Sequence, residues 1–229
     1  MFETREGILK HCSARNARAL GDIGRRFLER EQPGLEAQIA DIADAIAYNN
    51  HDVDDGFRAG LLSLEQLCEQ PLFNAQYRVV QAKYPGLEDR RFIYEIIRRM
   101  IDTVVTDLID TSRRNIVTAG PESIDDVRSL DHRLVSFSPD IGAEHLALKK
   151  FLHEHLYSHE QKLEMTQHVQ DVLRSLFAIY MDDLQAMPEE FSRRAADLDD
   201  SGRARVVADY IAGMTDRYAL KEHERLTPA

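Results

Sequence analysis

The sequence predicts an all-α protein, a bundle of several helices. Apolar residues recur at intervals of three, four or seven through most of the chain, which is the spacing of one helix face. Gly and Pro are sparse, at 11 and 7 of 229 residues, and Trp is absent. Because 43% of the residues are hydrophobic, the chain can bury a sizeable core, and we expect residues 1–229 to form a single all-helical region.

The charge and cysteine content of the sequence indicate which partners and which cellular location to expect. Asp and Glu number 40 against 29 Lys and Arg, and a net charge of −11 argues against nucleic-acid binding, since phosphate contacts need clustered cations. Cys12 and Cys68 occur without a CxxC motif or a secretory leader, so we expect a cytoplasmic location. No apolar run approaches the roughly 20 residues that span a bilayer, so we expect no membrane association.

The first predicted element is a basic amphipathic helix over residues 14–30. Leu20, Ile23 and Phe27 lie on its inner face, and Pro33 follows its end. Residues 35–57 form the next helix, with one apolar stripe that we expect to be core. Its members are Leu35, Ile39, Ile42, Ile46, Val53 and Phe57.

The opposite face of the helix over residues 35–57 is acidic. Asp44, Tyr48, His51 and Asp55 share it, and the stretch contains no Lys or Arg. A merely solvated helix face usually mixes charges, because opposite charges one turn apart stabilise it. A divalent metal or a cluster of Arg and Lys from elsewhere would balance these acids. A solvated acidic face remains the alternative.

Three more helices are predicted before residue 118. Ser63 caps a short one, Pro71 starts another that ends at Pro85, and the longest begins near residue 88. The longest carries two adjacent apolar rows, as a central helix packed by several neighbours would. The rows are Phe92, Ile96, Met100, Val104 and Leu108, and Ile93, Ile97, Ile101, Val105 and Ile109.

The second half begins with a long connection over residues 118–142, rich in Gly, Pro, Ser and Asp. We expect a short helix near residues 124–130 in it, and otherwise a mobile loop or an oligomer contact. Residues 143–229 form a C-terminal helical lobe, whose last amphipathic helix is interrupted by Gly213.

Motifs with an independent chemical meaning are few. Five histidines lie between residues 145 and 168, with His155 and His159 one turn apart, but the spacing is generic and the alternating charges around them indicate a solvated face. The sequence lacks GxGxxG, GxxxxGK[ST] and GxSxG, so no motif indicates a dinucleotide-binding site, a P-loop or a hydrolase nucleophile elbow.

Three stretches resemble one known family. The strings LEAQIADIADAIAYNNHDVDDGFRAGLL, DYIAGMTDRYALKEHERL and REGILKHCS are similar to the deoxyguanosinetriphosphate triphosphohydrolase-like family of the HD superfamily. The resemblance implies an all-helical, usually homo-oligomeric enzyme that hydrolyses a deoxynucleoside triphosphate to the deoxynucleoside and triphosphate. On this basis residues 1–118 are the remainder of an HD-type core.

The resemblance also implies site residues. The family's metal lies between a His, a His-Asp pair and a final Asp, which matches Asp44, and Tyr48 matches a tyrosine beside the nucleotide. Lys10 matches a family lysine for which phosphate contact and a structural role are both open. Carboxylate and imidazole ligands suit Mg, Mn or a similar divalent ion.

This chain departs from the family pattern in its metal ligands. The family's RxxHS-like and HDxGHPPFGH-like elements should precede residue 1, so we expect a bundle incomplete at its N-terminus. A lone Asp44 would not hold a catalytic metal, and we expect little or no activity from this chain alone. The alternative is a non-enzymatic helical interaction or oligomerisation module built on residues 92–109 and 206–226.

Overall fold

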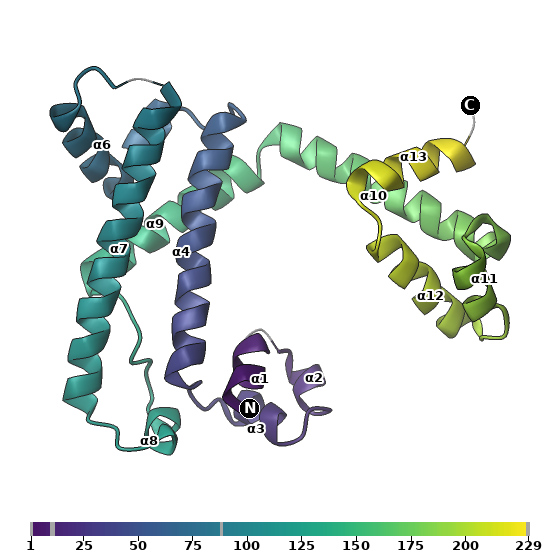
Figure 1. Ribbon diagram of the computed structural model, residues 1–229, viewed down its shortest axis with the longest axis horizontal. Helices are drawn as coiled ribbons and strands as arrows, with labels where there is room; N and C mark the ends of the chain where they lie inside the picture. The colour runs from purple at the N-terminus through teal and green to yellow at the C-terminus, as the bar shows by residue number, and fades with distance from the viewer. Residues whose placement is uncertain (1, 10–11, 88, 228–229) are drawn as a thin grey trace. The chain divides into compact units, whose positions relative to one another are not determined.

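The computed structural model describes residues 2–9, 12–87 and 89–227, and every regular element among them is helical (Figure 1). The all-α prediction is therefore confirmed. The chain divides into two compact units, residues 1–157 and 158–229, each with its own apolar core. Within the described part of the chain, no helix is both long enough and apolar enough to cross a membrane.

The first unit contains nine α-helices and a π-helical turn among its described residues. They are α1 (Phe2–Ile8), α2 (Ala14–Ala17), α3 (Asp22–Glu29), α4 (Leu35–Arg58), α5 (Leu64–Cys68), α6 (Pro71–Lys83), α7 (Asp89–Ala119), α8 (Ile124–Ser129), α9 (Pro139–Leu152) and the π turn His153–Tyr157. The helix α4 packs against α1, α7 and α9, and α6 packs against α7 and α9. The C-terminal lobe predicted over residues 143–229 begins within α9.

Most local signals produce the elements that they predict. The Ser63 hydroxyl oxygen accepts a hydrogen bond from the backbone amide of Gln66, and the Gln66 side-chain oxygen accepts one from the backbone amide of Ser63. This capping box starts α5. Pro71 is the first residue of α6. The α7 row from Ile96 to Leu108 is buried in the core of the first unit.

Two expectations for the N-terminal half are wrong. Residues 14–30 form two helices rather than one, because Gly21 adopts a φ of 58° and turns the chain between α2 and α3. Ile39 was expected in the core but is 52% exposed, since it faces a groove rather than a packed neighbour.

The connection before α9 is anchored to the long helices. The amide of Val135 donates to the Gln38 side chain on α4 at 3.0 Å, and the amide of Ser138 donates to Asp107 on α7 at 2.8 Å. Leu134 and Val135 are buried. The segment over residues 130–138 is therefore held in place beside α4, which matters for the site below.

The second unit is a small helical cluster. It contains α10 (Glu160–Asp182), a 3-10 turn (Leu184–Ala186), α11 (Glu189–Ala196), α12 (Asp200–Ala212) and α13 (Asp216–Leu226). Its core gathers Leu176 and Tyr180 of α10 with Val207 of α12. The break at Gly213 separates α12 from α13, as the sequence predicts.

Candidate functional site

A groove of about 840 Å³ runs beside one face of α4, within the first unit. Asp44, Tyr48 and Asp52 line it from α4 at intervals of four residues, so they share one face of the helix. Asp44 is half-buried, whereas the Tyr48 ring is 61% exposed. The acidic face predicted from the sequence is thus one wall of a groove.

The facing wall comes from α9 and the π turn that follows it. His145, Lys149, His153 and Tyr157 line the groove, again at intervals of four residues. In an α-helix such a row drifts slowly around the axis, and a π turn, which takes more residues per turn, reverses that drift. The π turn therefore keeps Tyr157 on the groove side.

Sequence reasoning missed this second row. It assigned the histidines between residues 145 and 168 to a solvated face, which is wrong for His145, since that side chain is buried. The periodic row of polar and aromatic residues from His145 to Tyr157 was the available signal. The π turn that completes it had no signature that we recognised.

The two walls are joined by a hydrogen bond at one end of the groove. The Tyr157 hydroxyl donates to Asp52 Oδ2 at 2.6 Å. This hydrogen bond, together with partial burial and the carboxylate charge, raises the pKa of Tyr157 to about 12. Tyr157 therefore stays a neutral donor at physiological pH and fixes the direction of the Asp52 carboxylate.

His145, the first residue of the α9 row, also joins the two walls. The Asn49 side-chain amide donates to His145 Nε2 at 3.1 Å and to the His145 carbonyl oxygen at 3.3 Å. With Nε2 as acceptor, we assign the neutral ring with its proton on Nδ1. Burial and the charge of Lys149 lower the pKa of His145, which favours the same neutral form.

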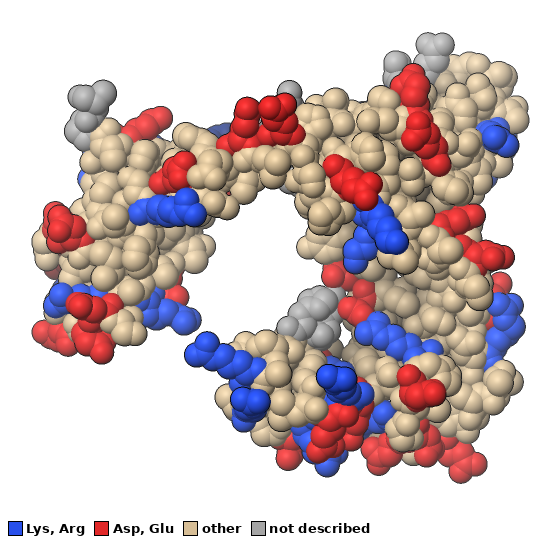
Figure 2. Space-filling model, turned by 180° about the vertical axis from the view of Figure 1, so that it is seen from behind, with Lys and Arg blue, Asp and Glu red and all other residues tan. Residues whose placement is uncertain are grey.

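Basic side chains complement the acidic face of α4. Arg133, from the anchored connection, forms an ion pair with Asp41, and Lys149 lines the groove from α9. The one cation of α4, Arg58 in its last turn, pairs with Asp54 and Asp55. The basic side chains along this groove therefore come from residues about a hundred positions later in the chain. Figure 2 shows basic and acidic side chains interspersed on each unit, with no broad basic face in that view.

The predicted site residues have different outcomes. Asp44 and Tyr48 line one groove, and their roles stay predictions. Lys10 lies outside the described residues. Among the residues that are described, no three His, Cys, Asp or Glu side chains come close enough to hold a metal ion, so these residues alone do not fit a divalent-metal centre.

Known proteins resemble this chain over nearly all of its length. Residues 135–225 match the phosphohydrolase-associated domain. Several curated relatives carry the description deoxyguanosinetriphosphate triphosphohydrolase-like protein. The relative from Thiobacillus denitrificans is 48% identical over 225 residues, that from Bordetella parapertussis 51% over 225, and that from Nitrosomonas europaea 43% over 225.

The matches cover nearly all of this chain but only part of each relative. Each covers 98% of this chain, but only 58%, 57% and 59% of the respective relatives. The chain thus spans somewhat more than half the length of the curated relatives that it matches. At these identities over nearly all of its residues, the chain and these relatives are homologous.

Proposed function

We propose that this homologue of the deoxyguanosinetriphosphate triphosphohydrolase-like proteins binds a deoxynucleoside triphosphate in the groove beside α4. The reaction served is hydrolysis to the deoxynucleoside and triphosphate. One observation carries the proposal: Asp44 and Tyr48, the positions that match the family's site, line the same groove as Lys149 and Arg133. An acidic helix face opposed by cations and an exposed aromatic ring suits a ligand with phosphates, a sugar and a base.

Each group has a role in this proposal. The exposed Tyr48 ring packs against the sugar or base, and its apolar face supplies most of the contact energy. The Lys149 ammonium contacts phosphate oxygens, because a lysine at the mouth of a groove acts as a mobile point charge. The Asp52 carboxylate, oriented by Tyr157, can accept a further hydrogen bond from a sugar hydroxyl.

In this proposal Asp44 is one of several ligands of a divalent metal. Mg or Mn bound by carboxylate and imidazole ligands would activate water and offset phosphate charge. The described residues do not assemble a complete ligand set for such a metal.

The cellular setting is part of the proposal. Cys12 and Cys68 are free thiols, which fits the cytoplasm as the place of reaction. The homo-oligomer that the resemblance implies remains a prediction.

Calorimetric titration of dGTP into the 229-residue chain tests the groove, with Mg or Mn present. The expected result is measurable affinity that Tyr48→Ala weakens, by a factor of at least about five, since stacking on a base is worth about 1–3 kcal/mol. Tyr84→Ala, at a half-exposed tyrosine outside the groove, is the control and should bind like the wild type. No dGTP binding, or equal binding by both variants, would contradict the proposal.

A second measurement addresses Asp44. Mn that enters with dGTP, and is held mainly by the phosphate oxygens of the nucleotide, should strengthen binding to the wild type, and Asp44→Asn should remove that increase. Metal-free dGTP should bind Asp44→Asn at least as tightly as the wild type, because the substitution removes a negative charge from the groove. Release of triphosphate is followed in the same samples. Strong turnover that survives Asp44→Asn would show that the ligand assignment is wrong.

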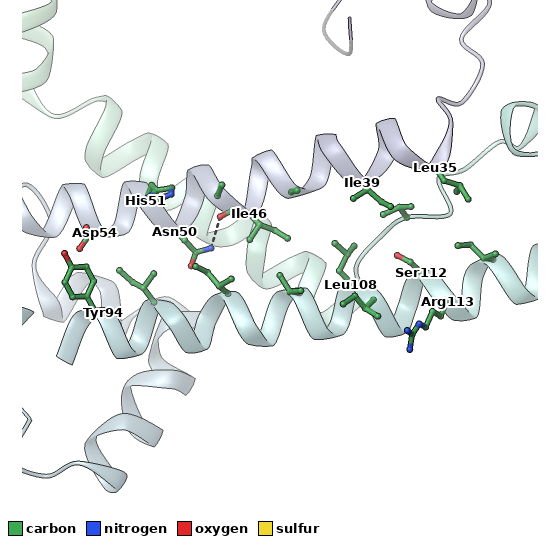
Figure 3. A pocket seen from close by; sticks show the side chains of 18 residues that line it. Leu35, Ile39, Ile46, Asn50, His51, Asp54, Tyr94, Leu108, Ser112 and Arg113 are labelled. Carbon is green, nitrogen blue, oxygen red and sulfur yellow. Dashed lines mark hydrogen bonds between the residues drawn. The ribbon is translucent and has the colours of Figure 1, made fainter. Parts of the chain in front are cut away.

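A non-enzymatic interaction module is the second candidate. A second groove, of about 780 Å³ and with an almost entirely apolar lining, lies between α4 and α7 and favours this candidate (Figure 3). A stable complex with another polypeptide and no nucleotide affinity is the outcome that would establish it over the first proposal.

A further inference from the structure

Asn49 is a buried asparagine of α4 whose side chain reaches across to α9. It is 5% exposed and lines the groove directly after Tyr48. Its Nδ2 donates to His145 Nε2 at 3.1 Å and to the His145 carbonyl oxygen at 3.3 Å. The amide has two N–H bonds, one for each acceptor. A single side chain of α4 thus holds both the ring and the backbone of one residue of α9.

The carbonyl group that Asn49 holds belongs to the helical turn of Lys149. In α9 each carbonyl oxygen accepts the amide four residues later, so that of His145 accepts the amide of Lys149. A carbonyl oxygen has two lone pairs and can accept from both donors. The Asn49 amide and the Lys149 backbone therefore meet at one oxygen atom, and the turn that carries the Lys149 side chain is tied to α4.

The His145 ring is held from a second side as well. Its centroid lies 5.0 Å from that of the Phe137 ring, with the two planes tilted by 39°. Phe137 belongs to the segment over residues 130–138, which is anchored to α4 and α7. The ring therefore cannot turn away from Asn49 without opening this contact.

The apolar contacts of α9 fix its rotation less closely than this polar contact does. Leu148, Phe151 and Leu152 are buried in the core of the first unit and keep the helix packed. Apolar contacts have no preferred direction, whereas a hydrogen bond weakens steeply outside a narrow range of distance and angle. Without the Asn49 amide, α9 would stay in place, but the side chains on its groove face would be less precisely directed.

Lys149 is the side chain that gains from this precision. Arg133 is engaged by Asp41 in an ion pair, whereas Lys149 is exposed and forms no ion pair with any residue that the structure describes. A lysine ammonium is a point charge on a flexible stem, so the position of its own backbone decides which oxygen atoms it can reach.

We propose that Asn49 and His145 are a positioning pair, which sets the turn of α9 from which Lys149 contacts the phosphates of a bound deoxynucleoside triphosphate. The inference deepens the proposed function and rests on it. Asn49 and His145 do not touch the phosphates, and their effect passes through Lys149. Removing the pair should therefore reduce what the phosphates add to the affinity and leave the contribution of sugar and base unchanged.

The test compares dGTP with deoxyguanosine, each titrated into the 229-residue chain. The ratio of the two dissociation constants measures what the phosphates add to the affinity. Lys149→Met removes the charge and keeps an unbranched side chain, and it should reduce this ratio roughly tenfold, the usual value of a hydrogen bond to a charged group. Asn49→Leu has nearly the same volume without a donor, and it should reduce the ratio about threefold or more.

A double-mutant cycle separates positioning from a general effect on the fold. In the Lys149→Met background, Asn49→Leu should not reduce the ratio further, because its effect passes through the lysine. Asn50→Leu is the matched control. Asn50 is also a buried asparagine of α4, but its amide donates to the Ile46 carbonyl oxygen of the same helix at 2.7 Å (Figure 3), so this variant should keep the wild-type ratio.

His145→Phe provides a second route to the same result if Asn49→Leu does not fold. It keeps a ring against Phe137 and removes the Nε2 acceptor, so it should also reduce the ratio.

Two results would overturn the inference alone. Asn49→Leu and His145→Phe could weaken dGTP and deoxyguanosine by the same factor, as a purely structural role predicts, or Asn49→Leu and Lys149→Met could reduce the ratio additively. Failure of the proposed function has a different signature, because the wild type itself would then bind dGTP no more tightly than deoxyguanosine, or bind neither.

Discussion

The hydrogen bond from Tyr157 to Asp52 connects the two walls of the groove beside α4 and can be tested by itself. Tyr157→Phe removes only the hydroxyl. We expect the free energy of unfolding to fall by about 0.5–1.5 kcal/mol, the usual net value of one such bond. Urea denaturation measures it, with Tyr84→Phe as a control outside the groove. Equal stabilities of wild type and Tyr157→Phe would mean that solvent replaces the bond without cost.

His145 predicts a pH dependence of stability. Burial lowers its pKa in the folded protein, so the unfolded chain binds a proton more readily at this position. The stabilisation is complete above the unfolded pKa of about 6.5 and is lost as the pH falls below it. The free energy of unfolding of the wild type should therefore drop more between pH 7 and pH 5 than that of His145→Gln.

The control for this pH series is His168→Gln, at an exposed histidine of α10. It should follow the wild type through the same range. If His145→Gln and the wild type lose stability in parallel, the buried ring is not the group responsible.

Single residues show how far the sequence could predict the site. Asp44 and Tyr48 lie on one helix, so helical periodicity places them on one face before any tertiary structure is considered. Arg133 and His145 reach the same helix from 92 and 96 residues away along the chain, through contacts to Asp41 and Asn49. Periodicity carries no information about contacts between residues so far apart in the chain. Arg133 and His145 are therefore absent from the predicted site.

At the scale of elements, the close packing of α2 against α3 predicts the effect of a substitution at Gly24 in α3. A Cβ at Gly24 would lie 1.8 Å from the carbonyl oxygen of Ala17, a backbone atom that cannot move aside alone. Gly24→Ala should therefore destabilise the protein by about 1–3 kcal/mol, as overpacking does. At Gly86, where an added Cβ meets nothing within 4 Å, the same substitution should leave stability unchanged or slightly raised. Thermal unfolding of the two variants compares them directly.

The long helices also show why core positions were predicted unevenly. The α7 row through Ile96, Met100 and Val104 is fully buried, whereas the adjacent row opens at Ile101 into the apolar groove. Both rows are apolar throughout and have the same spacing. A row is buried only where another element packs against it, and an apolar pattern indicates only that such packing is possible.

The whole molecule consists of two units whose cores share no residue among those described, and this division makes the last prediction. Met100 is buried in the core of the first unit and Leu176 in that of the second. Each unit has its own apolar cluster, so we expect each to unfold as its own cooperative transition in scanning calorimetry. Leu176→Ala should lower only one of the two transitions, at a cost of about 2–5 kcal/mol, because it leaves a cavity in one core. Met100→Ala should lower only the other by a similar amount. A single transition that both substitutions shift equally would show instead that the 229 residues unfold as one unit.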